Sequence, residues 1–175
     1  MKKYIVLYSS RTGNTKKIAE AVCSALPAGT PCRPVSEAPA DLNGYDCLFI
    51  GFWVDRGTAD QQTQQLLRQL KHPHIALFAT LGADPRSQHA ADSLCNAAAL
   101  LPGENPSVHS FICQGQVDPQ LIEQMKKMFP PGHPHAVDAK REALHAAAKK
   151  HPDEADVAAA KAFTAETVKR LENMC

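Results

Sequence analysis

Hydroxyl and amide side chains gather in one short segment near the start of the chain. Residues 9–15 read Ser-Ser-Arg-Thr-Gly-Asn-Thr, with a single glycine. Backbone N–H groups at the start of a helix have no partner within that helix, and the helix dipole favours negative charge there. The hydroxyls and the Asn14 amide add further donors, while Gly13 permits a positive φ or a close approach. The segment is a candidate phosphate site; the alternative is a turn that only caps a helix.

The elements around this segment favour the phosphate site. Residues 4–8 form a short apolar run typical of a strand buried on both faces. From Thr15 to Leu26 apolar residues recur with helical spacing, and Pro27 ends the pattern. The segment therefore connects the carboxyl end of a strand to the start of a helix. Neither of the two common glycine-rich nucleotide motifs, G-x-x-x-x-G-K-[ST] and G-x-G-x-x-G, occurs in the chain.

The rest of the chain continues the alternation of strands and helices. Further strands are expected at 31–35, 47–51, 74–80 and 108–113, and helices at 59–70, 87–101 and 118–129. Such alternation predicts an α/β fold, a doubly wound five-stranded parallel sheet with helices on both faces. Residues 52–57 and 81–86 are expected to be loops after two of the strands.

The composition changes after residue 132. Alanine, lysine and glutamate dominate there, and helices are expected at 137–150 and 153–173. We predict one domain over residues 1–132 and a C-terminal helical extension, residues 133–175, packed on it through an apolar stripe. A role in partner binding or in covering a ligand is the alternative for the extension.

Composition excludes several functions. The 19 basic and 18 acidic residues leave a net charge of +1, which gives no electrostatic signature for nucleic acid. No apolar run approaches the ~20 residues of a membrane span. The apolar run from Tyr4 to Leu7 is too short to be the apolar region of a signal peptide. The six cysteines include no C-x-x-C pair, and two His-Pro-His stretches lack acidic or cysteine companions, so no metal site is expected. The expected location is the cytoplasm.

The phosphate segment also carries a resemblance. Ser10, Thr12, Gly13, Asn14 and Thr15 match the pattern S-x-T-G-N-T position for position. In this the chain resembles the flavodoxins, whose FMN phosphate binds there, and the resemblance covers about residues 3–130 by order of elements. The stretch GFWVDRGTAD at residues 51–60 is most similar to the BilS-type flavodoxin-like proteins of anaerobic bacteria. A flavodoxin-like sheet and FMN as cofactor are what this resemblance implies.

The resemblance to the flavodoxins implies that three loops bind FMN. Their residues are Ser9, Ser10, Arg11, Thr12, Gly13, Asn14 and Thr15; then Phe52, Trp53, Val54, Asp55 and Gly57; then Thr80, Leu81, Gly82 and Ala83. We expect Trp53 to stack on the ring, whereas Phe52 is more suited to packing inward. A turn at Gly57 would let a backbone carbonyl accept a hydrogen bond from N5 of the reduced flavin, and Gly82 is the expected point of close approach.

The charge balance departs from that of acidic flavodoxins. Five basic residues are expected near the flavin edge: Arg11, Lys16, Lys17, Arg56 and Arg86. A charge about 9 Å away changes a one-electron potential by roughly 20 to 80 mV. We therefore expect a less reducing flavin than in an acidic flavodoxin.

The function expected from these features is FMN-dependent electron transfer, with no catalytic side chain. Resemblance to the BilS-type group implies a redox partner protein, such as a flavin-dependent bilirubin reductase that this chain assists. One alternative is an FMN-dependent oxidoreductase that acts on quinones with NAD(P)H; another is a redox-inert binding module. The sequence pattern does not indicate the oligomeric state.

Overall fold

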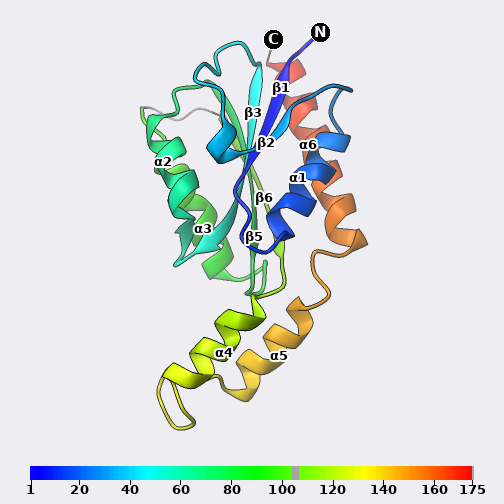
Figure 1. The fold of residues 1–175 in the computed structure, drawn as a ribbon. Coiled ribbons are helices and arrows are strands. Elements are labelled where there is room, and N and C mark those ends of the chain that lie inside the picture. The colour runs from blue at the N-terminus through cyan, green and yellow to red at the C-terminus, as the bar shows by residue number, and fades with distance from the viewer. Residues whose placement is uncertain (104–106, 175) are drawn as a thin grey trace.

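The computed structural model describes residues 1–103 and 107–174, so Cys175, the last residue of the expected extension, lies outside it. A six-stranded sheet forms its centre, in the order β2-β1-β3-β5-β6 with β4 beside β3 (Figure 1). All neighbours on that path are parallel, and β4 is antiparallel to β3. The strands are β1 (Tyr4–Tyr8), β2 (Cys32–Pro34), β3 (Cys47–Asp55), β4 (Thr58–Ala59), β5 (His74–Leu81) and β6 (Ser107–Gln114).

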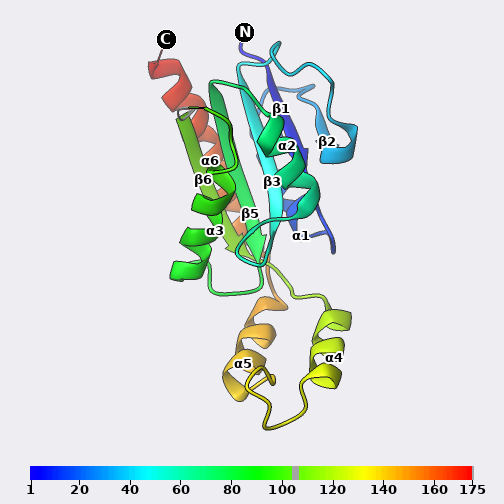
Figure 2. The ribbon, with the colours of Figure 1, turned by 90° about the vertical axis from the view of Figure 1, so that its left-hand side faces the viewer.

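Helices cover both faces of this sheet. On one face lie α1 (Asn14–Ser24) and α6 (Glu154–Asn173), and on the other lie α2 (Gln61–Gln69) and α3 (Gln88–Ala98) (Figure 2). A short 3₁₀ turn, η1 (Val35–Glu37), follows β2. Strands β1, β3 and β5 are buried along most of their length because both faces are covered. The predicted doubly wound α/β fold is confirmed.

The sheet separates two apolar cores. Tyr4, Phe49 and Phe78 lie in the core under α1 and α6, while Ile5 and Leu7 lie in the core under α2 and α3. Alternate residues of a strand point to opposite faces, which sends the neighbours Tyr4 and Ile5 to different cores. None of the described helices is long and apolar enough to cross a membrane.

The strand that carries Trp53 is longer than the sequence indicated. Residues 52–55 continue β3 instead of forming a loop, and Arg56-Gly57 makes a two-residue turn into β4. Both turn residues have positive φ, 50° and 80°, which is the geometry of a tight hairpin. The expected loop over 52–57 is therefore wrong, because the antiparallel pairing of β4 keeps the strand extended.

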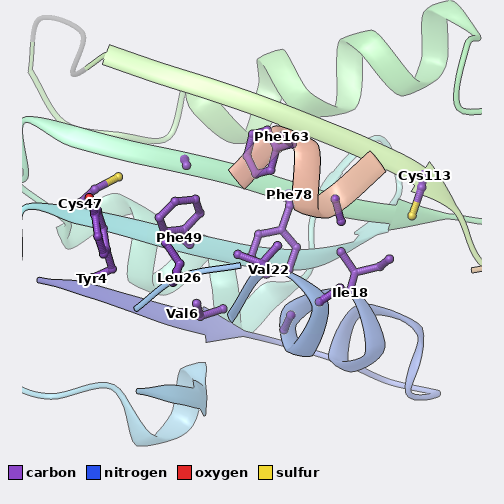
Figure 3. Packing of buried hydrophobic residues seen from close by; sticks show 14 of the residues in the cluster. Tyr4, Val6, Ile18, Val22, Leu26, Cys47, Phe49, Phe78, Cys113 and Phe163 are labelled. Carbon is purple, nitrogen blue, oxygen red and sulfur yellow. The ribbon is translucent and has the colours of Figure 1, made fainter. Parts of the chain in front are cut away.

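Helix α6 is part of the principal core. Phe163 packs edge-on against Phe49 at 6.3 Å between ring centroids (Figure 3). It also stacks on Phe111 at 5.6 Å between ring centroids. Its neighbours Ala160 and Leu171 are buried in the same core. The domain boundary expected at residue 132 stays a prediction, and α6 covers the same sheet face as α1.

Two helices lie outside the layered body. Helices α4 (Pro119–Met128) and α5 (Ala139–Ala148) project as a pair beyond the end of the sheet at which the parallel strands finish (Figures 1 and 2). We call residues 119–150 the helical hairpin. It is inserted between β6 and α6.

Candidate functional site

A cavity of about 420 Å³ opens at the carboxyl ends of the parallel strands. Strand order reverses between β1 and β3, and ligands of open α/β sheets bind at such a switch point. Residues from all three predicted loops line the cavity: Ser10, Arg11, Thr12, Asn14, Thr15, Trp53, Val54, Asp55, Thr80, Leu81 and Gly82. Ser9, Gly13, Phe52, Gly57 and Ala83 are not among the lining residues.

The start of α1 forms the anion-binding part of this cavity. Gly13 is the N-cap residue with a φ of 94°, and no acidic residue stands in the first turn. The Ser10 hydroxyl accepts hydrogen bonds from the amides of Gly13, at 3.1 Å, and Lys16, at 3.2 Å. In the described structure the amides of Asn14 and Thr15 have no acceptor. Free amides at a helix start, beside hydroxyl groups, suit a phosphate.

A buried hydroxyl pair joins two of the predicted loops. Thr15 Oγ1 and Thr80 Oγ1 lie 2.9 Å apart, and both residues are nearly fully buried. The pair ties the first turn of α1 to the end of β5. Both residues line the cavity, as does Asn14 with its free backbone amide.

A fourth segment completes the cavity, and the sequence interpretation missed it. Five lining residues were not predicted, and all of them follow β6: Gly115, Gln116, Val117, Asp118 and Leu121. Arg56 of the β3–β4 turn, expected near the flavin edge as a basic residue, also lines the cavity. The side-chain nitrogen Nδ2 of Asn14 donates to the Gln116 carbonyl at 2.8 Å, which links the first segment to the fourth. A Cβ on Gly115 would lie 2.8 Å from Asn14 Nδ2, so only glycine leaves room for this contact.

Trp53 supplies the aromatic surface of the cavity. The guanidinium carbon of Arg11 lies 5.7 Å from the centre of its ring, within the range of a cation–π contact. The same guanidinium lies 3.7 Å from an Asp118 carboxylate oxygen. Arg11 therefore connects the aromatic wall to the fourth segment across the cavity.

Three of the positions that do not line the cavity have structural roles. Phe52 is fully buried in the core under α2 and α3, because its neighbour Trp53 faces the other side of the strand. Gly57 occupies the β3–β4 turn, and its carbonyl accepts from the Asn96 side chain at 2.9 Å. Ser9 is buried behind the loop, and its amide donates to the Gly51 carbonyl at 2.9 Å.

Gly82 is a point of close approach, as expected, but the observed neighbour is protein. A Cβ on Gly82 would lie 2.3 Å from Val117 Cγ2. The Gly82 carbonyl also accepts from the Gln114 side chain at 3.3 Å. The glycine therefore lets the third and fourth segments pack together.

Charges at the cavity are balanced. Arg11 and Arg56 line it, but so do Asp55 and Asp118. The other basic residues expected there have partners of their own. Lys16 lies 4.0 Å from Glu20, Lys17 donates to the Pro152 carbonyl, and Arg86 lies against Asp84. The backbone amide and side chain of Arg86 hold the pKa of Asp84 below its usual value.

One group of possible metal ligands occurs among the described residues. His151, Asp153 and Asp156 place ligand atoms within 4.8 Å of one another. Asp153 caps α6 by accepting from the Asp156 amide, which lowers the pKa of Asp153, and Asp156 accepts from the Asp153 amide. His151 Nδ1 lies 2.6 Å from the Asp156 carboxylate. Capping of the start of α6 therefore accounts for the clustering of these three side chains.

Comparison with known proteins agrees with this architecture. The model of the flavodoxin domain family matches residues 5–165. The chain belongs to the flavodoxin domain family. Two curated relatives are both described as the flavodoxin-like domain-containing protein BilS. One, from Clostridioides difficile, is 34% identical and covers 92% of this chain and 93% of its own. The other, from Clostridium symbiosum, is 33% identical and covers 95% and 96%.

Solved structures share the fold at low identity. A WrbA-like flavodoxin from Agrobacterium tumefaciens has a TM-score of 0.59 at 13% identity and covers 99% of both chains. A flavoprotein from Lactobacillus acidophilus, solved in complex with FMN, has a TM-score of 0.50 at 20% identity and covers 71% of this chain and 98% of its own. The family match supports FMN as the cofactor predicted from the sequence, and the solved structures show the shared fold.

Proposed function

We propose that this chain is an FMN-binding electron-transfer protein of the cytoplasm. The observation that carries the proposal is the start of α1, beside a cavity walled by Trp53, where the backbone amides of Asn14 and Thr15 have no acceptor among the described residues. Bound FMN would supply reversible electron transfer. The residues of the chain bind and orient it: α1 holds the phosphate, and Trp53 offers a flat surface to the ring.

The redox partner is proposed from the BilS-type relatives. These proteins cover nearly the whole chain at 33–34% identity. We propose that this chain assists a flavin-dependent reductase, such as a bilirubin reductase, by supplying electrons. Loss of reductase turnover when this chain is omitted, and recovery when it is added back, would support that role.

The test of cofactor binding is direct. The purified protein is expected to be yellow and to release FMN in acid, and the protein freed of flavin should bind FMN more tightly than riboflavin. Each charge-assisted hydrogen bond to the phosphate contributes roughly 1.5 to 3 kcal/mol, so the ratio of affinities should be about tenfold or more. A colourless protein that binds neither flavin in calorimetry would refute the proposal and leave a redox-inert module.

A second function is favoured by one wall of the cavity. Leu121, in the first turn of α4, lines it, so the helical hairpin closes one side as an organic substrate pocket requires. The alternative is therefore an FMN-dependent NAD(P)H:quinone-type oxidoreductase. Turnover of NADPH with a quinone, measured without any partner protein, distinguishes this enzyme from a carrier.

A further inference from the structure

The helical hairpin is weakly packed for a unit of its size. No side chain of α4 is buried, and Ala148 is the buried residue of α5. Met128 is 69% exposed, and Ile122 and Phe129 are half-buried. Both views show the pair projecting clear of the layered body (Figures 1 and 2). A projecting pair that buries so little apolar surface is suited to contact with another molecule.

The hairpin also holds a concentration of positive charge that the balanced total conceals. Residues 119–150 contain six basic and three acidic residues, a net charge of +3, whereas the remainder of the chain carries −2. Lys126 lies 3.7 Å from Glu142. Within the described residues no ion pair involves the lysines of the exposed set Lys127, Lys140, Lys149 and Lys150. Arg141 and Lys126 contribute, after burial, to a lowered pKa of His145, as expected beside excess positive charge.

One end of the helical hairpin lies next to the proposed FMN cavity. Helix α4 begins with Asp118 as its N-cap, and both Asp118 and Leu121 line the cavity. A molecule held against this end of the hairpin is therefore close to the cavity mouth. The position is the one required of a docking surface for electron transfer.

We propose that the helical hairpin docks the acidic surface of a redox protein and holds that protein beside the cavity. The inference rests on the proposed function, because it assigns the docking surface for the same electron transfer. Complementary charge steers such encounters and raises their rate at low salt. The hairpin also carries the exposed Met128, the half-buried Phe129 and three acidic residues. This mixture of apolar and acidic side chains favours a protein partner over a nucleic acid.

A reduced acidic ferredoxin serves as the probe. In the reaction, one electron leaves the iron–sulfur cluster of the ferredoxin and is gained by FMN bound to the full chain. The rate of FMN reduction is measured by stopped-flow absorbance at about 20 and 500 mM salt. The hairpin variant is Lys127→Glu, Lys140→Glu, Lys149→Glu and Lys150→Glu. The matched control, Lys3→Glu, Lys71→Glu, Lys161→Glu and Lys169→Glu, changes the net charge equally at exposed positions outside the hairpin.

We expect the low-salt rate of the hairpin variant to fall about tenfold or more, and that of the control by less than about threefold. Equal losses in the two variants, or no loss in either, would overturn the proposal. A Lys→Gln version of the hairpin variant, with folding checked by circular dichroism, should show a smaller loss in the same direction.

Association measured separately by biolayer interferometry keeps docking apart from the proposed function. Hairpin-dependent association with the ferredoxin, without electron gain, supports docking and refutes the proposed function. FMN reduction that does not depend on the hairpin supports the proposed function and refutes docking at the hairpin. Hairpin-dependent binding to duplex DNA or to anionic vesicles, with none to the ferredoxin, would assign the surface to another class of partner and overturn the proposal.

Discussion

The buried hydroxyl pair of Thr15 and Thr80 gives a test of both the fold and the phosphate site. Valine has nearly the shape of threonine, so Thr15→Val removes the hydroxyl with little change in packing. The Thr80 hydroxyl, in a residue 3% exposed, then loses its partner 2.9 Å away. A buried polar group without a partner costs about 1 to 3 kcal/mol.

A double-mutant cycle measures this cost. Thr15→Val and Thr80→Val should each lower the free energy of unfolding of the flavin-free protein by about 1 to 3 kcal/mol. The double variant removes both hydroxyls and should lose less than the sum, giving a coupling of about 0.5 to 3 kcal/mol. Urea unfolding of the four proteins, with a common m-value, provides these numbers.

Flavin binding by the same variants tests the phosphate assignment. Loss of a charge-assisted hydrogen bond should weaken FMN by about tenfold or more, while riboflavin, which has no phosphate, should bind with unchanged affinity. Thr164→Val is the matched control. Thr164 is also buried, and its hydroxyl donates to the Ala160 carbonyl on α6. That change should affect stability and leave the ratio of FMN to riboflavin affinity unchanged.

Two results would refute this reasoning. Additive losses in the cycle would show that the hydroxyls of Thr15 and Thr80 do not stabilise each other. Equal weakening of FMN and riboflavin would show that the phosphate does not bind at the start of α1.

Three further changes have defined outcomes. Trp53→Ala should weaken FMN and riboflavin alike by about tenfold, through the lost stacking and apolar contact, in a fluorescence titration; unchanged riboflavin affinity would contradict the ring assignment. Gly51→Ala would place a Cβ 2.2 Å from the buried Phe78 ring and should lower the free energy of unfolding by about 1 to 3 kcal/mol in urea. Burial lowers the pKa of His109 below 6.5, so the unfolded chain binds its proton first and stability falls as pH drops below 6.5; His109→Gln should flatten this part of the profile of urea midpoint against pH.

Most of the fold could be predicted because its strands are buried on both faces. Such strands are continuous apolar runs, and their bounds in the structure differ by a few residues from the expected ones. The extended end of β3 had no such signal. Its pairing with β4 depends on the Arg56-Gly57 turn, and neither residue is apolar or recurs in a pattern.

The fourth segment of the cavity shows which part of a site sequence reasoning can reach. Gly115 follows a predicted strand, and the carboxyl ends of parallel strands meet at one edge, so its general location was available from topology. The contacts themselves were not. The approach of Val117 to Gly82, and of Asn14 to Gly115, joins positions far apart in the chain, and no local pattern encodes such tertiary contacts.

The placement of charge separates the flavin potential from the encounter with a redox partner, two properties that the net charge alone does not distinguish. At the cavity the positive charges of Arg11 and Arg56 are offset by Asp55 and Asp118, so their effects on a flavin potential largely cancel. The excess positive charge lies instead on the helical hairpin, where four lysines have no ion pair within the described residues. Exposed charges beyond about 8 Å are largely screened at physiological salt. A less reducing potential than in acidic flavodoxins would then come from missing acidic charge near the ring, while the hairpin governs encounter with a partner. Neutralising the hairpin lysines should therefore change the rate of electron transfer and its salt dependence without changing the potential.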